Sequence, residues 1–130
     1  MAKFSIDELL MGRVKQSELS AELLDNARKL ISKINALMLD LGVKEPKFIS
    51  SGYRRPDDNK KAGGSLNSPH LRCLAVDIAD VGQHLSTLIA SKPDLLRKHD
   101  LWLENPLYTP TWCHIDAATR KDRPSRVFNP

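Results

Sequence analysis

The sequence predicts a single α+β domain in which a small antiparallel sheet packs against helices from the N-terminal and central parts of the chain. Its 130 residues correspond to one domain. Helical periodicity dominates the first third, and short β-compatible runs dominate the rest, an order typical of α+β folds with antiparallel sheets. We expect one domain over residues 1–130, with a helical part at 5–42, a part at 47–118 that carries the candidate site, and a basic tail at 119–130.

Two helices are predicted in the N-terminal part. Ser5-Ile-Asp-Glu8 has the S-x-x-E form of a capping box and precedes two leucines. Between Leu19 and Leu41, apolar residues recur at steps of three and four, as they do on one face of a helix. Gly42 follows, and glycine is the usual residue just after a helix. We expect a short first helix and then a long scaffold helix that ends at Leu41.

After residue 47 the pattern changes to short strand-like runs. A polar loop at 52–69 separates the first two runs and contains almost no apolar residue. A compact domain seldom carries so long a loop without a functional reason, so we expect the site beside it. Residues 81–98 read as helical, with Pro93 starting a second turn. The strand-like runs lie at 48–51, 74–78, 101–104 and 112–115.

Composition and charge argue against several functional classes. No apolar stretch approaches the ~18 residues of a membrane span, so we expect no membrane insertion. The net charge of +4 favours anionic partners, but the chain has only seven aromatic residues and no alternation of aromatic and basic residues, which argues against nucleic-acid binding. Asp7 and Glu8 stand where an export signal needs apolar residues. We therefore expect a protein that is cytoplasmic when made, and we also expect it to be a monomer.

His70, Asp77 and His114 are the candidate metal ligands. Asp77 and His114 each lie inside an apolar, strand-like run, and His70 comes just before the run that holds Asp77. A buried carboxylate is costly without a partner, and a cation is an economical one. Two imidazoles and one carboxylate are a recurring catalytic zinc set that leaves a fourth position for water. Hydrogen-bonded structural histidines are the alternative that spacing alone leaves open.

Three ordered motifs resemble those of a known enzyme family. They are Ser51-Gly-Tyr-Arg-Arg-Pro56 followed by Asn59, then Ser68-Pro-His-Leu-Arg-Cys-Leu-Ala-Val-Asp77, and finally Trp112-Cys-His114. In this order they resemble the motifs of the M15 peptidases. That group includes D-Ala-D-Ala carboxypeptidases and phage L-alanyl-D-glutamate endopeptidases, and it shares its fold with the hedgehog signalling domain. The resemblance covers residues 48–116, about half the chain.

The resemblance implies a zinc peptidase that acts on peptidoglycan stem peptides. In that reading the zinc ligands are His70, Asp77 and His114, and Arg54 or Arg55 lies near the scissile carbonyl or a substrate carboxylate. The small size and the lack of an export signal most resemble a phage or prophage endolysin, which acts on the cell wall after release, or a component of a phage particle. The expected substrate-binding residues are Tyr53, Asn59, Ser68 and Trp112.

The sequence departs from the family pattern at two places. Cys73 stands where the motif has glycine, and residues 109–113 lack the acid that many members place before the second histidine. Glu104, in the neighbouring strand-like run, is our expected general base, and Asp116 is its rival. Asp116 shares a strand face with His114 and could instead orient that imidazole. Without a base, the chain would be a catalytically inactive, zinc-containing binding or structural domain of phage origin.

Overall fold

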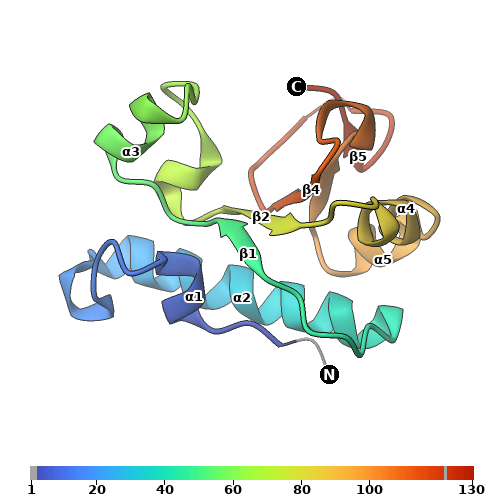
Figure 1. The fold of residues 1–130 in the computed structure, drawn as a ribbon, viewed down its shortest axis with the longest axis horizontal. Coiled ribbons are helices and arrows are strands. Elements are labelled where there is room, and N and C mark those ends of the chain that lie inside the picture. Colours follow the sequence, from blue (N-terminus) through green and yellow to red (C-terminus); the bar gives the residue numbers. More distant parts are fainter. Residues whose placement is uncertain (1–2, 122) are drawn as a thin grey trace.

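A five-stranded sheet forms the centre of the protein, with the long helix α2 lying along it (Figure 1). The computed structural model describes residues 3–121 and 123–130, so residues 1, 2 and 122 of the domain expected at 1–130 lie outside the described part. The strand order across the sheet is β1-β2-β4-β3-β5. The strands are β1 (Ile49–Ser51), β2 (Ala75–Ala79), β3 (Trp102–Glu104), β4 (Trp112–Asp116) and β5 (Val127–Phe128).

The two N-terminal helices form as the sequence predicts. Ser5 Oγ accepts a hydrogen bond from the Glu8 amide at 3.1 Å, and the Glu8 carboxylate accepts one from the Ser5 amide at 2.9 Å, which completes the capping box. Gly42 ends α2 in the left-handed conformation, with φ of 71°. The helices are α1 (Ile6–Leu10), α2 (Ala21–Leu41), α3 (Pro56–Lys61), α4 (His84–Ala90) and α5 (Pro93–Lys98).

The alternation of side chains along β2 and β4 separates the core from the site. Val76, Ile78, Cys113 and Ile115 point to one face, where they are buried in the same cluster as the apolar face of α2. Burying each large aliphatic side chain contributes about 1.5–3 kcal/mol, so this face holds the sheet on its helix. The opposite face of the same two strands carries Asp77 and His114.

The expected α+β fold is confirmed, but the sheet is mixed and not antiparallel throughout. The pairs β1–β2, β2–β4 and β3–β4 are antiparallel, but β5 runs parallel to β3. The parallel pairing of β5 with β3 follows from the place where β4 ends. Asp116, the last residue of β4, lies opposite Trp102, the first residue of β3. A chain that leaves the sheet at that end and returns along the far edge of β3 must run in the same direction as β3. The tail at 119–130 therefore contributes a strand.

The polar segment at 52–69 is also more ordered than the sequence indicates. It contains α3 and part of a 3₁₀ helix at Pro69–Arg72. Pro56 occupies the first turn of α3, the Asp58 carboxylate accepts from the Arg55 amide at 3.1 Å, and lysines occupy the last turn. These are ordinary helix-terminus signals in a segment too polar to show helical periodicity. In the view of Figure 1, α3 lies above β1 and β2, and the long helix α2 lies below them.

None of the helices in the described ranges 3–121 and 123–130 is long and apolar enough to cross a membrane.

Cys73 adopts a left-handed backbone conformation, which explains why the motif it belongs to favours glycine. It follows the 3₁₀ helix at Pro69–Arg72 with φ of 57° and ψ of 33°, and its side chain is fully buried. A left-handed conformation costs roughly 1–2 kcal/mol for a residue with a Cβ. Cys73 therefore tolerates a strained position while filling space in the core.

We expect Cys73→Val to lower the free energy of unfolding by about 1–2 kcal/mol more than Cys113→Val does. Both thiols are fully buried, so the added methyl group crowds each site. Only Cys113 lies in extended backbone, which suits a β-branched side chain. Urea unfolding of the metal-free variants measures the difference. Equal losses for the two variants would show that the left-handed backbone adds nothing to the cost.

Candidate metal centre

Asp77 and His114 face each other across the centre of the sheet. They are register partners on the antiparallel strands β2 and β4, so their side chains project from the same face. His114 Nδ1 lies 2.8 Å from Asp77 Oδ1. Both residues are buried, and each is fixed by a strand whose other face is in the core. The sheet register alone therefore brings two of the three expected ligands together.

His70 reaches the same point from the 3₁₀ helix at Pro69–Arg72. Its Nδ1 lies 2.8 Å from the carbonyl oxygen of Gly52, and its Nε2 lies 3.4 Å from Asp77 Oδ2. Ser68 Oγ accepts a hydrogen bond from the His70 amide at 3.3 Å and so caps this short helix. Because the carbonyl can only accept, Nδ1 carries the proton and Nε2 is left facing Asp77.

Gly52 can present its carbonyl to His70 because it has no side chain. A Cβ at this position would lie 2.0 Å from the carbonyl oxygen of Leu9, in α1. The next amide, that of Tyr53, donates to the same Leu9 oxygen at 2.8 Å. The first helix therefore positions the segment that holds His70, which links the scaffold to the site.

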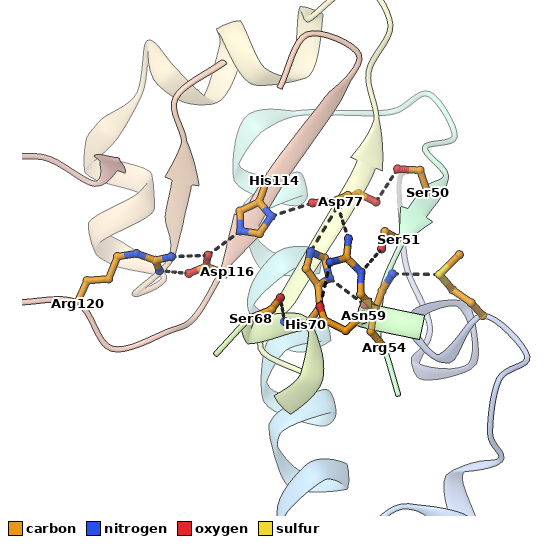
Figure 2. Close-up of polar contacts among 12 residues, drawn as sticks. Ser50, Ser51, Arg54, Asn59, Ser68, His70, Asp77, His114, Asp116 and Arg120 are labelled. Carbon is orange, nitrogen blue, oxygen red and sulfur yellow. Dashed lines mark hydrogen bonds and ion pairs between the residues drawn. The ribbon is translucent and has the colours of Figure 1, made fainter. Parts of the chain in front are cut away.

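His114 is held between two carboxylates (Figure 2). Its second nitrogen, Nε2, lies 2.7 Å from Asp116 Oδ2. Burial by itself lowers the pKa of the imidazole, but the hydrogen bonds with Asp116 and Asp77 outweigh burial and raise the pKa to about 9. Without a metal, the ring therefore carries both protons at neutral pH. The Nδ1 proton lies between His114 and Asp77.

The three side chains fit a zinc ion by donor type and by arrangement. One ligand atom from each of His70, Asp77 and His114 lies within 4.8 Å of the other two, and all three residues are buried. The remaining nitrogen of each ring already has a hydrogen-bond partner, as is usual for metal-binding histidines. Two imidazole nitrogens and one carboxylate oxygen leave a tetrahedral ion one open position.

Arg54 adds positive charge beside the Asp77 carboxylate. Its Nη2 lies 3.8 Å from Asp77 Oδ2. Burial raises the pKa of Asp77, but hydrogen bonds with His114 and His70 outweigh burial and hold that pKa well below its usual range. Asp77 is therefore ionised, as a metal ligand must be.

The three candidate ligands line a cavity of about 430 Å³. Arg54, Ser68, Glu104 and Trp112 line the same cavity, so four of the residues expected at the catalytic or substrate site lie around the candidate ligands. The C-terminal segment also contributes to the wall, through Arg120, Phe128 and Pro130.

Glu104 projects from the face that carries His114. Trp102 lies opposite Asp116 in the β3–β4 register, and Glu104 is two residues further along β3, hence on the same face. Burial raises the pKa of Glu104, His114 lowers it, and Asp77 and Asp116 raise it, for a net increase. A carboxylate with a raised pKa is a stronger proton acceptor than a fully solvated one.

The family comparison agrees with this arrangement. A model of the family described as Peptidase M15 matches residues 2–116. The chain belongs to the peptidase M15 family. Members of this family are typically zinc-dependent, in agreement with the cluster of His70, Asp77 and His114. A comparison with curated proteins finds no matching relative.

Three of the expected residues of this M15 peptidase lie away from the cavity lining. Tyr53 is buried in the hydrophobic core. Arg55 is exposed and pairs with Asp58, with Nε 2.8 Å from Oδ2. Asn59 is buried, accepts from Arg54 Nη1 at 3.4 Å and donates to the Ser65 carbonyl at 2.8 Å. Asn59 therefore holds Arg54 and the following loop in place.

The structure also brings residues to the candidate site that the sequence analysis did not expect there. Gly52 belongs to the motif at residues 51–56, but nothing in the sequence shows that its carbonyl contacts His70. Arg120 and Phe128 lie in the polar tail. The one sequence feature that could indicate a contact between Arg120 and Asp116 is their spacing of four residues. That spacing has no special meaning outside a helix, so the sequence does not reveal their proximity to the site.

Proposed function

We propose that the protein is a zinc-dependent peptidase that hydrolyses peptide bonds in peptidoglycan stem peptides. The observation that carries the proposal is the set of three buried ligand atoms within 4.8 Å of one another, in a cavity that an acid and an arginine also line. Family membership supports both the metal and the reaction class. All of these groups come from one chain.

Glu104 is the proposed general base. A zinc ion held by His70, Asp77 and His114 would supply Lewis-acid polarisation of the peptide carbonyl and acidify a water molecule. Glu104 accepts a proton from the attacking water and then donates it to the leaving amine, a dual role that suits a carboxylate with a raised pKa. Asp116 is less suited, because its buried carboxylate is already held by His114 and Arg120.

Arg54 is the proposed electrostatic stabiliser of the oxyanion. Its guanidinium lies beside Asp77 and lines the cavity, and Ser51 Oγ and Asn59 Oδ1 hold it at 3.2 and 3.4 Å. A donor that is held before the reaction stabilises developing charge at little reorganisation cost. Arg55, which faces solvent, would not reach the reacting bond.

The cavity suits a peptide that carries free carboxylates. Arg54 and Arg120 both line it, and a bound divalent cation would add to the positive potential. Peptidoglycan stem peptides carry such carboxylates on their side chains and termini. Trp112 and Ser68 line the same cavity and are the proposed substrate contacts.

We expect the purified protein to bind about one zinc per chain and to lose peptidoglycan cleavage when a chelator removes it. Asp77→Ala and His70→Ala should lose stoichiometric zinc, whereas His84→Ala, at an exposed histidine, should keep it. Elemental analysis measures the content. Full occupancy in the Asp77→Ala, His114→Ala double variant would contradict the ligand assignment.

Glu104→Gln should retain zinc and fold but lose about 100-fold or more in turnover, because a positioned proton acceptor typically contributes at least that much. Glu22→Gln, at an exposed position on α2, is the matched control and should cleave at the wild-type rate. Mass spectrometry of new termini released from soluble muropeptides measures cleavage. A near wild-type rate for Glu104→Gln would reject Glu104 as base. A zinc-loaded wild-type protein that cleaves nothing would favour the catalytically inactive alternative.

Arg54→Ala should lower kcat by about 100-fold with zinc content intact, the scale for loss of one oxyanion donor. Arg55→Ala is its neighbour in sequence and should stay within about twofold of wild type, because a surface substitution away from the site has little effect. The muropeptide assay reports both rates. Equal activities of the two variants would contradict the proposed catalytic role of Arg54.

A further inference from the structure

The C-terminal segment reaches the metal centre through Asp116. This carboxylate is fully buried, and its Oδ2 lies 2.7 Å from His114 Nε2. Arg120 clamps both oxygens: Nη2 donates to Oδ2 at 3.0 Å, and Nη1 donates to Oδ1. The Ala118 amide donates to Oδ1 at 3.2 Å. The carboxylate thus has fixed donors on every side, and His114 is one of them.

Aromatic rings hold Arg120 in turn. Its Cζ lies 3.8 Å from the ring centroid of Phe128 and 5.8 Å from that of Trp102. A guanidinium over an aromatic face is attracted by the ring electrons, and more strongly where water is excluded. Phe128 is itself fixed because β5 pairs with β3, where the Asn105 amide donates to the Phe128 carbonyl at 2.7 Å. The tail strand therefore fixes the guanidinium.

This chain of contacts sets which nitrogen of His114 faces the other ligands. An ionised carboxylate only accepts hydrogen bonds, so Nε2 must carry a proton toward Asp116. In the neutral ring, Nδ1 is then the unprotonated nitrogen, and it points at Asp77. If Asp116 rotated or moved, the imidazole would lose both its preferred tautomer and its orientation.

We propose that Arg120 is a positioning residue for the metal centre, acting through Asp116 on His114, and that β5 forms part of the site. The family match ends at residue 116, so nothing in it accounts for Arg120 or Phe128. The inference rests on the proposed metal-binding function. It goes beyond that function because it assigns a role to a segment that supplies none of the three candidate ligands.

Zinc affinity, measured by competition with a chromophoric chelator, tests the proposal. Replacement of outer groups that hold metal ligands typically weakens binding by about 10- to 100-fold, so Arg120→Ala should weaken it about tenfold. Arg126→Ala is the matched control. Arg126 also lies over Trp102, at 4.4 Å, but its ion pair is with Asp100. We expect Arg126→Ala to bind zinc within about twofold of wild type.

A double-mutant cycle separates this role from general stabilisation of the fold. If Arg120 acts through Asp116, Arg120→Ala should add no further loss of zinc affinity in an Asp116→Ala background. The absorption spectrum of the cobalt-substituted protein should also change in Arg120→Ala and stay unchanged in Arg126→Ala. A purely structural role would lower the melting temperature of the metal-free protein without changing affinity or spectrum.

The zinc affinity and the cobalt spectrum of the Arg120 variants decide whether the inference stands. Wild-type zinc affinity and an unchanged cobalt spectrum in Arg120→Ala would overturn the inference, as would additive losses in the cycle. If Arg120→Ala does not fold, Arg120→Lys decides, because lysine keeps the charge but lacks the two-pronged geometry. Weaker zinc binding in that variant supports the inference, and unchanged binding overturns it. Failure of the wild-type protein to bind zinc would instead overturn the proposed function.

Discussion

The pairing of Asp77 with His114 across β2 and β4 is the constraint on which the rest of the structure depends. A carboxylate and an imidazole are buried opposite each other in the middle of an otherwise apolar sheet. Their burial would be costly without mutual compensation, and the alternation of strand side chains keeps both off the core face. The scaffold helix α2 holds the core face, so the opposite face can be polar without weakening the packing.

The site is assembled from segments that are distant in sequence and are joined by backbone contacts. Gly52 connects α1 to His70: its carbonyl meets the imidazole, and its missing side chain leaves room for the Leu9 carbonyl. The same segment continues into Arg54, whose amide donates to the His70 carbonyl at 3.1 Å. A shift of the first helix would therefore move one candidate metal ligand, His70, and one proposed catalytic residue, Arg54, together. The short helix α1 therefore helps to set the positions of His70 and Arg54.

Three carboxylates around the centre have different roles because their surroundings differ. Asp77 and Asp116 are both buried, and burial raises the pKa of each. Hydrogen bonds with His114 and His70 outweigh burial at Asp77, and hydrogen bonds with His114 and Arg120 outweigh it at Asp116, so the pKa of each is lowered and both stay ionised. Among residues 3–121 and 123–130, Glu104 has no such hydrogen-bond partner, and burial raises its pKa. The two ionised groups hold and orient histidines, whereas the third is suited to exchange a proton. The proposed roles of ligand, positioning group and base thus follow from different surroundings: Asp77 and Glu104 line the cavity, whereas Asp116 contacts it through His114.

The sequence by itself determined the family, the long scaffold helix and the three candidate ligands, because each depends on a local pattern. The helix α2 follows from a period of 3.6 residues, the family from a specific motif around His70 and Asp77, and the candidate ligands from polar residues inside apolar strands. Only the tertiary structure decided which of the two arginines enters the cavity and that β5 completes a mixed sheet. It also decided that Arg120 reaches Asp116. These features depend on contacts between distant segments and on where strands end, and neither a short-range period nor a residue type encodes such positions.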